Sequence, residues 1–348
     1  MHLQEAPEDR VRGTAEGLSK LGVERVAHCT GRDVDVRELR ALVERVVREV
    51  LSREGDRGVE VPKRKKTRPG IVLAIVGGKG GTGKTTVAVN LAVSLRGPLR
   101  FFDGDVEEPD AYLFLRPIFR ETVPVEVPVP QFDLSRCTYC GACAEFCRFN
   151  AIAVARENLV FFEGLCRSCG GCAIVCPAGA ISPRGKEIGQ VWIGETGEVR
   201  FFGGRLVPGE QMVSPILWTL AGYRDDEAVN IVDGPPGTRA GMIEAVWGAD
   251  YCLLVTEPTP LGLHDLVRSA EVLGILGIPY GVVLNKDEIG DGRVEQFCEG
   301  NQVPILLRIP YDRDIAALCA RGIPFAREDP GWAKKFGELF RAVQEEVS

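Results

Sequence analysis

Residues 77–86 carry glycines, lysines and threonines in a spacing that suits the binding of phosphate. Gly78 opens a GxxxxGK[ST] pattern that Gly83-Lys84-Thr85 closes. In such a loop, backbone N–H groups point at phosphate oxygens, the lysine holds the β- and γ-phosphates, and the threonine hydroxyl ligates Mg²⁺. A chance Gly-rich turn is the alternative. The residues predicted to bind nucleotide here are Gly78, Lys79, Gly80, Gly81, Thr82, Gly83, Lys84, Thr85 and Thr86.

Two blocks of cysteines repeat at an interval of 29 residues. Each block has the Cys-x₂-Cys-x₂-Cys-x₃-Cys spacing of bacterial two-cluster ferredoxins, in which the fourth cysteine ligates the cluster of the other block. The sequence therefore predicts two [4Fe–4S] clusters. Their ligands are Cys137, Cys140, Cys143 and Cys176 for the first, and Cys166, Cys169, Cys172 and Cys147 for the second. Paired zinc knuckles are the alternative, but zinc sites rarely carry a third cysteine at this spacing.

Arg148 departs from the pattern, because it follows Cys147 where Pro177 follows the last cysteine of the second block. A cation beside a cluster stabilises its reduced, more negative form, so we expect the cluster ligated by Cys147 to have a raised reduction potential.

Acidic residues follow two predicted strands, at 99–103 and 228–233. Asp105 lies just beyond the first strand and suits a magnesium and water site beside the phosphates. Asp233 ends the second strand and is the second carboxylate on the magnesium side, while Gly237 offers a backbone N–H to the γ-phosphate. The predicted magnesium ligands are Thr85, Asp105 and Asp233.

The elements that must position these residues alternate between strand and helix. Residues 71–76 are an apolar, partly β-branched run typical of a strand buried on both faces, and residues 87–95 have the periodicity of a helix. Further strands are predicted at 250–256, 280–285 and 305–310, further helices at 212–220, 261–276 and 330–347, a β-hairpin at 190–203 and an extended Pro-rich connector at 124–130. The fold class is therefore α/β: a mostly parallel P-loop sheet with helices on both faces, plus an inserted α+β ferredoxin-like domain.

This pattern divides the chain into an ATPase domain at 69–123 and 204–348 and an insert at 124–203. Residues 1–68 have no assigned role. His28-Cys29 could ligate a metal, but sequence neighbours rarely point the same way, so a turn with a buried cysteine is preferred. The basic run at 62–69 suits a solvated linker better than a nucleic-acid patch.

Composition narrows the classes of function. The 348 residues carry a net charge of −7, which argues against general nucleic-acid binding. Apolar runs fall well short of a membrane span, and the acidic N-terminus does not resemble a signal peptide. Twelve cysteines without an export signal point to metal rather than disulfides and to a cytoplasmic protein.

The second lysine of the loop, Lys79, gives the deviant Walker A form and is similar to that of the MinD/ParA/Mrp/nitrogenase-iron-protein group of ATPases. The resemblance extends to 103–105, 233–238, 256–258, 285–286 and 309–312. With the cysteine blocks, the chain resembles MinD-superfamily ATPases that contain an inserted ferredoxin domain.

This resemblance implies a homodimer with ATP at its interface. Lys79 would reach across to the partner's phosphates, Asp105 would orient or deprotonate the attacking water, and Asn285 would read the adenine. Pro310 and Asp312 belong to the segment that would cup the adenine. The chain lacks the Cys-x-x-Cys with which Mrp-type carriers bridge a cluster across the dimer, which weakens a delivery role.

Three functions follow as hypotheses. The first is ATP-gated electron transfer through two [4Fe–4S] clusters to a redox protein. The second is ATP-dependent assembly, in which iron–sulfur or another metallocofactor is inserted into an apo-metalloprotein. The third is a spatial-positioning ATPase whose clusters are structural or sense redox state.

Overall fold

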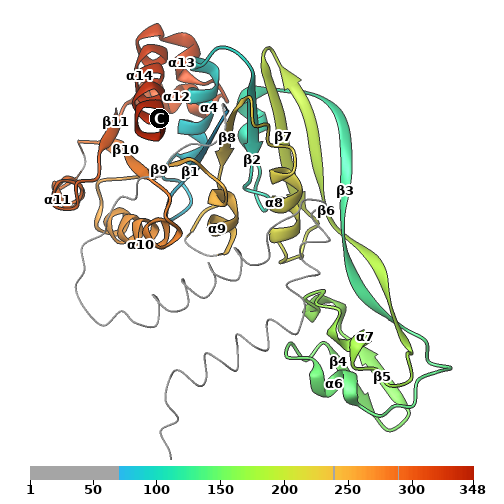
Figure 1. Ribbon diagram of the computed structural model, residues 1–348. Coiled ribbons are helices and arrows are strands. Elements are labelled where there is room, and N and C mark those ends of the chain that lie inside the picture. The colour runs from blue at the N-terminus through green and yellow to red at the C-terminus, as the bar shows by residue number, and fades with distance from the viewer. Residues whose placement is uncertain (1–69, 238–239, 289) are drawn as a thin grey trace, which may run out of the picture. The chain divides into compact units, whose positions relative to one another are not determined.

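The computed structural model describes residues 70–237, 240–288 and 290–348, so the predictions for 1–68 lie outside it. Contacts divide the described chain into two compact units (Figure 1). The larger unit contains 70–123, 190–206 and 216–348, and the smaller contains 124–189 and 207–215, apart from the gaps just given. Each unit is described by itself.

A nine-stranded sheet runs in the order β11-β10-β9-β1-β8-β2-β7-β6-β3. All six neighbouring pairs from β11 to β7 are parallel. The strands are β1 (Ile71–Val76), β2 (Leu99–Asp103), β3 (Ile118–Phe132), β6 (Ile181–Thr196), β7 (Val199–Leu206), β8 (Val229–Asp233), β9 (Tyr251–Thr256), β10 (Tyr280–Asp287) and β11 (Ile305–Pro310). This confirms the predicted α/β class with a mostly parallel sheet.

The central strands are apolar along their whole length because both of their faces are covered. All six residues of β1 and all six of β9 are buried. Such continuous runs are typical of parallel strands between two helical layers. Because parallel strands end at one edge of the sheet, the loops after β1, β2, β8 and β10 meet there, and these loops carry the predicted nucleotide site.

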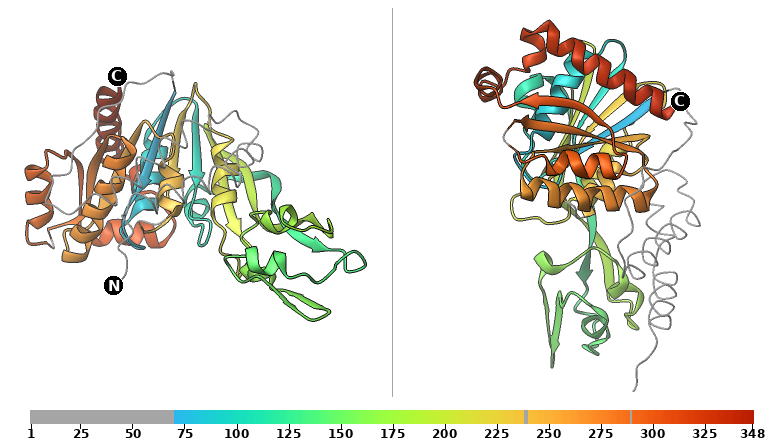
Figure 2. Two further views of the ribbon diagram at one scale, coloured as in Figure 1. Left: turned by 60° about the horizontal axis from the view of Figure 1, so that its bottom comes forward. Right: turned by 90° about the vertical axis from the view of Figure 1, so that its left-hand side faces the viewer.

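Helices cover both faces of the sheet (Figures 1 and 2). α4, α13 and α14 pack together, and α9 and α10 contact the central strands. The helices of the larger unit are α4 (Lys84–Ser94), α5 (Ala111–Leu115), α8 (Ser214–Ala221), α9 (Ala240–Val246), α10 (Pro260–Leu276), α11 (Arg293–Gly300), α12 (Arg313–Ala320), α13 (Phe325–Glu328) and α14 (Pro330–Val347), of which α8 begins in the smaller unit. No helix in the described ranges has both the length and the apolar character needed to cross a bilayer.

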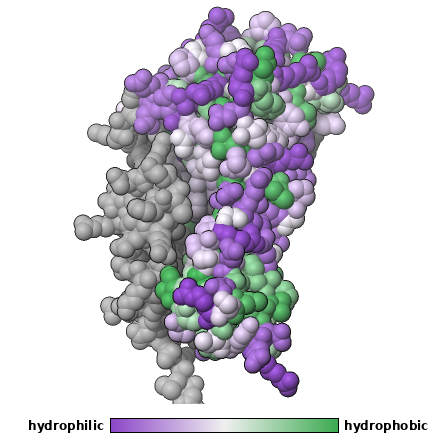
Figure 3. All heavy atoms as spheres, turned by 90° about the vertical axis from the view of Figure 1, so that its right-hand side faces the viewer, coloured by the Kyte–Doolittle hydropathy of each residue, from purple (hydrophilic) through white to green (hydrophobic). Residues whose placement is uncertain are grey.

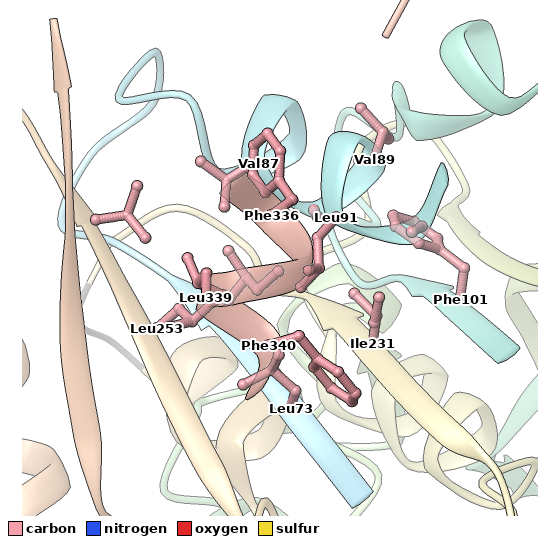
Figure 4. Packing of buried hydrophobic residues seen from close by; sticks show 14 of the residues in the cluster. Leu73, Val87, Val89, Leu91, Phe101, Ile231, Leu253, Phe336, Leu339 and Phe340 are labelled. Carbon is pink, nitrogen blue, oxygen red and sulfur yellow. The ribbon is translucent and has the colours of Figure 1, made fainter. Parts of the chain in front are cut away.

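The last helix, predicted at 330–347, packs on the sheet. Phe336, Leu339 and Phe340 of α14 are buried and belong to the same cluster as Val87 of α4 and Leu73 of β1 (Figure 4). This cluster fixes the helix that follows the phosphate loop against the strand that precedes it.

Two parts of the fold differ from the sequence prediction. Residues 124–130, predicted as a connector, lie within β3 at the edge of the sheet. Its prolines lack the N–H that an inner strand would need, but an edge strand tolerates them. The predicted hairpin is longer than expected, and β7 pairs in parallel with β2, so residues 190–206 group with the larger unit rather than with the insert.

The smaller unit repeats one pattern around its two cysteine blocks. In each block a glycine with positive φ, Gly141 or Gly170, precedes a short helix. Cys143, Cys172 and Ile152 form its buried core. Its elements are α6 (Ala142–Phe146), β4 (Ile152–Ala155) antiparallel to β5 (Asn158–Phe161), a 3₁₀ turn at Glu163–Leu165, and α7 (Gly171–Ile174).

Candidate nucleotide and cysteine sites

The loop between β1 and α4 folds around the side chain of Lys84. Gly81 and Gly83 have φ values of +82° and +96°, a conformation that other residues rarely adopt. The Lys84 ammonium donates to the carbonyl oxygen of Lys79 at 3.0 Å. Because glycines carry no side chain, the backbone N–H groups of this loop remain accessible to an anion.

Four carboxyl groups surround Lys84 and Thr85 at the same edge of the sheet. Burial raises the pKa of Asp233 to about 8, and the neighbouring Asp110 adds to that rise, while the Thr85 hydroxyl and Lys84 oppose it. Burial also raises the pKa of Asp110, with the same two groups opposing it. Within the described chain, neither oxygen of Asp233 makes a well-formed hydrogen bond. Buried carboxylate oxygens without donors are suited to a cation.

Asp105 lies at the more open side of this cluster. Burial raises its pKa to about 6, whereas the backbone N–H of Glu108 and the Lys84 ammonium lower it. A carboxyl group poised near neutral pH can accept a proton from water. Its position beside Lys84 and Asp233 is the one predicted for a magnesium-side, water-orienting residue.

Asp103 and Asp110 complete the cluster and are not among the predicted magnesium ligands. Asp103 is fully buried and accepts hydrogen bonds from the N–H groups of Asp105 at 3.3 Å and Ala111 at 3.1 Å. It therefore folds the loop after β2 back on itself and brings Asp110 to Thr85. The only sequence signal was an acidic residue just before a short apolar run.

The other predicted nucleotide residues lie around the loop at the ends of neighbouring strands. A Cβ atom on Gly237 would be 3.7 Å from the carbonyl oxygen of Gly78, so the two loops adjoin. Asn285 donates its amide to the carbonyl of Thr82 at 2.8 Å and thereby braces the phosphate loop. Pro310 ends β11, and the Asp312 carboxylate caps α12. The adenine contacts of these residues stay predictions.

Lys79 is half-exposed. In the part of the chain that the structure describes, its ammonium group makes no hydrogen bond or ion pair, whereas its carbonyl oxygen accepts from Lys84. Its side chain is thus available to a group outside the described chain.

The first cysteine set lines one pocket. The thiols of Cys137, Cys140, Cys143 and Cys176 share it with the apolar side chains of Phe132, Val154, Leu159 and Ile181. Burial raises the pKa of Cys143, and the nearby Cys137 and Cys176 raise it further. Cys176 therefore lies with the first block, as the crossed ligand assignment predicts.

The second set shows the same crossing. Burial raises the pKa of Cys166, and Cys169 and Cys147 raise it further, while the Lys186 ammonium lowers it. Backbone N–H groups donate to four of the eight sulfur atoms. For Cys137 and Cys166 the donor is the N–H group two positions later in the chain, at 3.4 Å each. For Cys147 and Cys176 the donor is the N–H group four positions later, at 3.4 Å and 3.3 Å. Such donors stabilise thiolates.

As the side chains lie, no group of three or more His, Cys, Asp or Glu residues in the described ranges could hold a metal ion. In addition to burial, neighbouring thiols raise the pKa of Cys143, Cys166 and Cys172, and neighbouring carboxyl groups raise that of Asp103 and Asp233; a bound cation would reverse this repulsion. The apolar surface of the smaller unit is visible in Figure 3. Its exposed large apolar residues are Leu134, Phe149, Val160, Phe162, Leu165, Ile174 and Val207.

Comparison with known proteins supports the phosphate-loop assignment. A model of the CobQ/CobB/MinD/ParA nucleotide binding domain matches residues 73–325. An uncharacterised protein of Methanocaldococcus jannaschii is 31% identical over 268 residues, or 74% of this chain and 92% of that protein. An iron-sulfur cluster carrier protein of the same organism is 22% identical over 294 residues, or 79% and 84%. The Pyrococcus furiosus cell division ATPase MinD has 24% identity and a TM-score of 0.49, covering 80% of this chain and 100% of that one.

Proposed function

The chain belongs to the CobQ/CobB/MinD/ParA nucleotide-binding family, and from this premise we propose that it hydrolyses ATP to gate electron transfer through two [4Fe–4S] clusters to a redox protein. One observation carries the proposal above the others. The strand that enters the cysteine-bearing unit, β3, begins at Ile118, eight residues after Asp110 of the carboxylate cluster. A change at the nucleotide is therefore close along the chain to the strand that leads to Cys137, the first of the predicted cluster ligands.

ATP and Mg²⁺ fit this family, and the site supplies the groups that phosphoryl transfer requires. Thr85, Asp233 and Asp105 would hold the magnesium ion directly or through water, and Lys84 would leave the Lys79 carbonyl to hold the phosphates. Asp105 would orient the attacking water and accept its proton. Phosphoryl transfer depends mainly on alignment and charge neutralisation, which these residues provide.

Lys79 would complete the site of a second subunit. Its ammonium group is unpaired among the described residues, and the phosphates already have Lys84 within the same chain. A second cation supplied only by the partner would make hydrolysis depend on dimerisation, because the transition-state charge would be neutralised only in the dimer.

The cysteines fit two cubane clusters better than zinc. Each set joins three cysteines of one block to the fourth of the other, and the first set surrounds a pocket with apolar walls. Clusters so held exchange single electrons at potentials set by nearby charge and hydrogen bonds. The four N–H donors and Lys186 are the groups of this chain that would set those potentials.

Cofactor assembly is the second candidate, and the named relatives favour it. Iron-sulfur cluster carrier proteins of Methanocaldococcus jannaschii, Methanococcus maripaludis and Pyrococcus horikoshii are 22–25% identical over 77–79% of this chain. Against delivery, Cys298 is buried and Cys319 lies 21 residues away, so the ATPase part offers no adjacent surface pair to share a cluster. Spatial positioning stays an alternative without an observation that favours it.

Electron-transfer rates separate these candidates. Dithionite-reduced protein, handled without oxygen, is mixed with an oxidised ferredoxin-type acceptor with no nucleotide, with Mg·ADP, or with Mg·ATP. The proposal predicts a rate that depends on ATP and loses this dependence in Lys79→Ala. An unchanged rate, together with transfer of iron and sulfide to an apo-protein, would favour assembly instead.

A further inference from the structure

One short helix, α5, lies between the carboxylate cluster and the strands that lead into and out of the cysteine-bearing unit. Asp110 immediately precedes α5, and β3 follows α5 toward Cys137. The chain returns from Cys176 along β6. Both strands have their near ends, residues 118–123 and 190–196, in the larger unit with α5.

The start of α5 is tied to the nucleotide site by two carboxyl groups. Asp103 accepts the N–H of Ala111 at 3.1 Å. Asp110 has one oxygen that is buried without a hydrogen-bond partner in the described ranges, and the Thr85 hydroxyl and Lys84 are close enough to affect its ionisation. The first residues of α5 therefore lie against the groups expected to bind magnesium and phosphate.

Tyr112, the second residue of α5, contacts both β3 and β6. The ring of Tyr112 stands edge-on to Trp192 of β6, with centroids 6.0 Å apart and planes at 82°. It also lies 6.5 Å from Phe119 of β3, which itself packs on Trp192 at 5.8 Å. Edge-to-face pairs depend on ring orientation, so a small rotation of α5 changes both contacts.

We propose that Asp110 is a positioning residue of the magnesium site and that Tyr112 passes the occupancy of that site to β3 and β6. The inference rests on the proposed function only in requiring that a magnesium nucleotide binds at Lys84 and Thr85. It assigns a role to Asp110 and Tyr112 that the phosphate loop by itself does not need.

The physical cause is the attraction of a cation for carboxylates. Asp110 lies close to the carboxyl groups of Asp233 and Asp105, and a divalent cation bound at Thr85 would attract all three in their charged forms. The far end of α5 is held, because the Arg116 guanidinium donates to the carbonyl of Arg321 at 3.4 Å. Because α5 has only five residues, a pull on Asp110 at its start is expected to tilt the helix and move the ring of Tyr112.

Trp192 provides a direct readout that does not require iron. The chain has four tryptophans, so the full-length protein labelled with 5-fluorotryptophan should give four ¹⁹F resonances, assigned by single Trp→Phe variants. Titration to saturation with Mg·ADP is expected to shift the Trp192 resonance. Trp332 of α14, which packs against Phe325 and Phe336, is the internal control, and its resonance should not shift.

Variants test each step of the link. Asp110→Ala should still bind Mg·ADP at saturation but lose the Trp192 shift. Tyr112→Leu should bind with unchanged affinity and also lose the shift, whereas Tyr112→Phe, which keeps the ring, should retain it. Leu113→Ala changes an exposed neighbour on the same helix and is the matched control, with the shift intact.

A Trp192 resonance that stays fixed in the saturated wild type, or that still moves in both Asp110→Ala and Tyr112→Leu, would overturn the inference. Its failure is distinguishable from that of the proposed function. If Trp192 moves while electron-transfer rates ignore nucleotide, the link exists and gating is wrong. If the rates respond while Trp192 does not, gating uses another route.

Discussion

Replacing Asp233 by asparagine should make the metal-free protein less sensitive to pH. The Asp233 carboxyl group is fully buried and has a pKa of about 8, against an ordinary value of 3.8. Between those values the folded chain holds a proton that the unfolded chain has lost. The free energy of unfolding therefore falls as pH rises through this window, with a slope of about 1.4 kcal/mol per pH unit for one proton.

The size of the effect follows from the window that can be measured. From pH 6 to pH 7.5 this one group should lower the free energy of unfolding by about 2 kcal/mol. Asparagine does not titrate, so the Asp233→Asn variant should gain about that much relative to wild type over the same interval. Burial raises the pKa of Asp103 and the Asp233 carboxylate raises it further, so the substitution lowers that pKa and adds to the difference between the two proteins.

Urea denaturation in EDTA, followed by tryptophan fluorescence, measures this difference. All four tryptophans, at 192, 218, 247 and 332, lie in the larger unit, so the signal reports on the unit that contains Asp233. Asp291→Asn is the control, because Asp291 is exposed and Arg293 holds its pKa below the ordinary value. If the gap between wild type and Asp233→Asn did not widen with pH, the buried, ionisable carboxyl at the magnesium site would be refuted.

Four other substitutions have expected outcomes. Lys79→Ala should leave Mg·ATP binding, measured by calorimetry, close to wild type and abolish phosphate release; retained turnover would argue against a lysine acting across a dimer. Cys176→Ser and Cys147→Ser should each remove about half of the bound iron, but from different clusters, so their EPR spectra should differ; identical residual spectra would contradict the crossed ligand sets. Phe336→Ala, which empties a fully buried position, should cost about 3–5 kcal/mol in the free energy of unfolding, and a loss below about 1 kcal/mol would show that α14 packs loosely.

Local patterns were enough to predict the strands of the ATPase sheet and the loops at their ends. The strands at 71–76, 99–103 and 305–310 have the predicted bounds, because long apolar runs between turns leave few alternatives. The crossing of Cys147 and Cys176 between blocks stays a prediction, and the pocket that Cys176 shares with Cys137, Cys140 and Cys143 is compatible with it. Spacing alone carried that information, since short chain segments limit where a fourth ligand can come from.

Features that depend on distant pairing were missed. The prolines of β3 made this segment look unlike a strand, because proline has no N–H to donate to a neighbouring strand. That loss matters only in a strand with neighbours on both sides, and β3 pairs with β6 alone. Asp110 reaches Thr85 only because Asp103, seven residues earlier, accepts the N–H of Ala111. The Tyr112 contact with Trp192 spans 80 positions of the sequence. Neither tertiary contact leaves a periodic signal.

The central claim is that a nucleotide site governs iron–sulfur clusters in the same chain. Anaerobic purification followed by iron and sulfide analysis and by EPR of the reduced protein, with and without Mg·ATP, tests it most directly. We predict about eight iron and eight sulfide per chain and a reduced spectrum or midpoint potential that changes with ATP. A protein without iron, or spectra and potentials that ignore ATP, would contradict the claim.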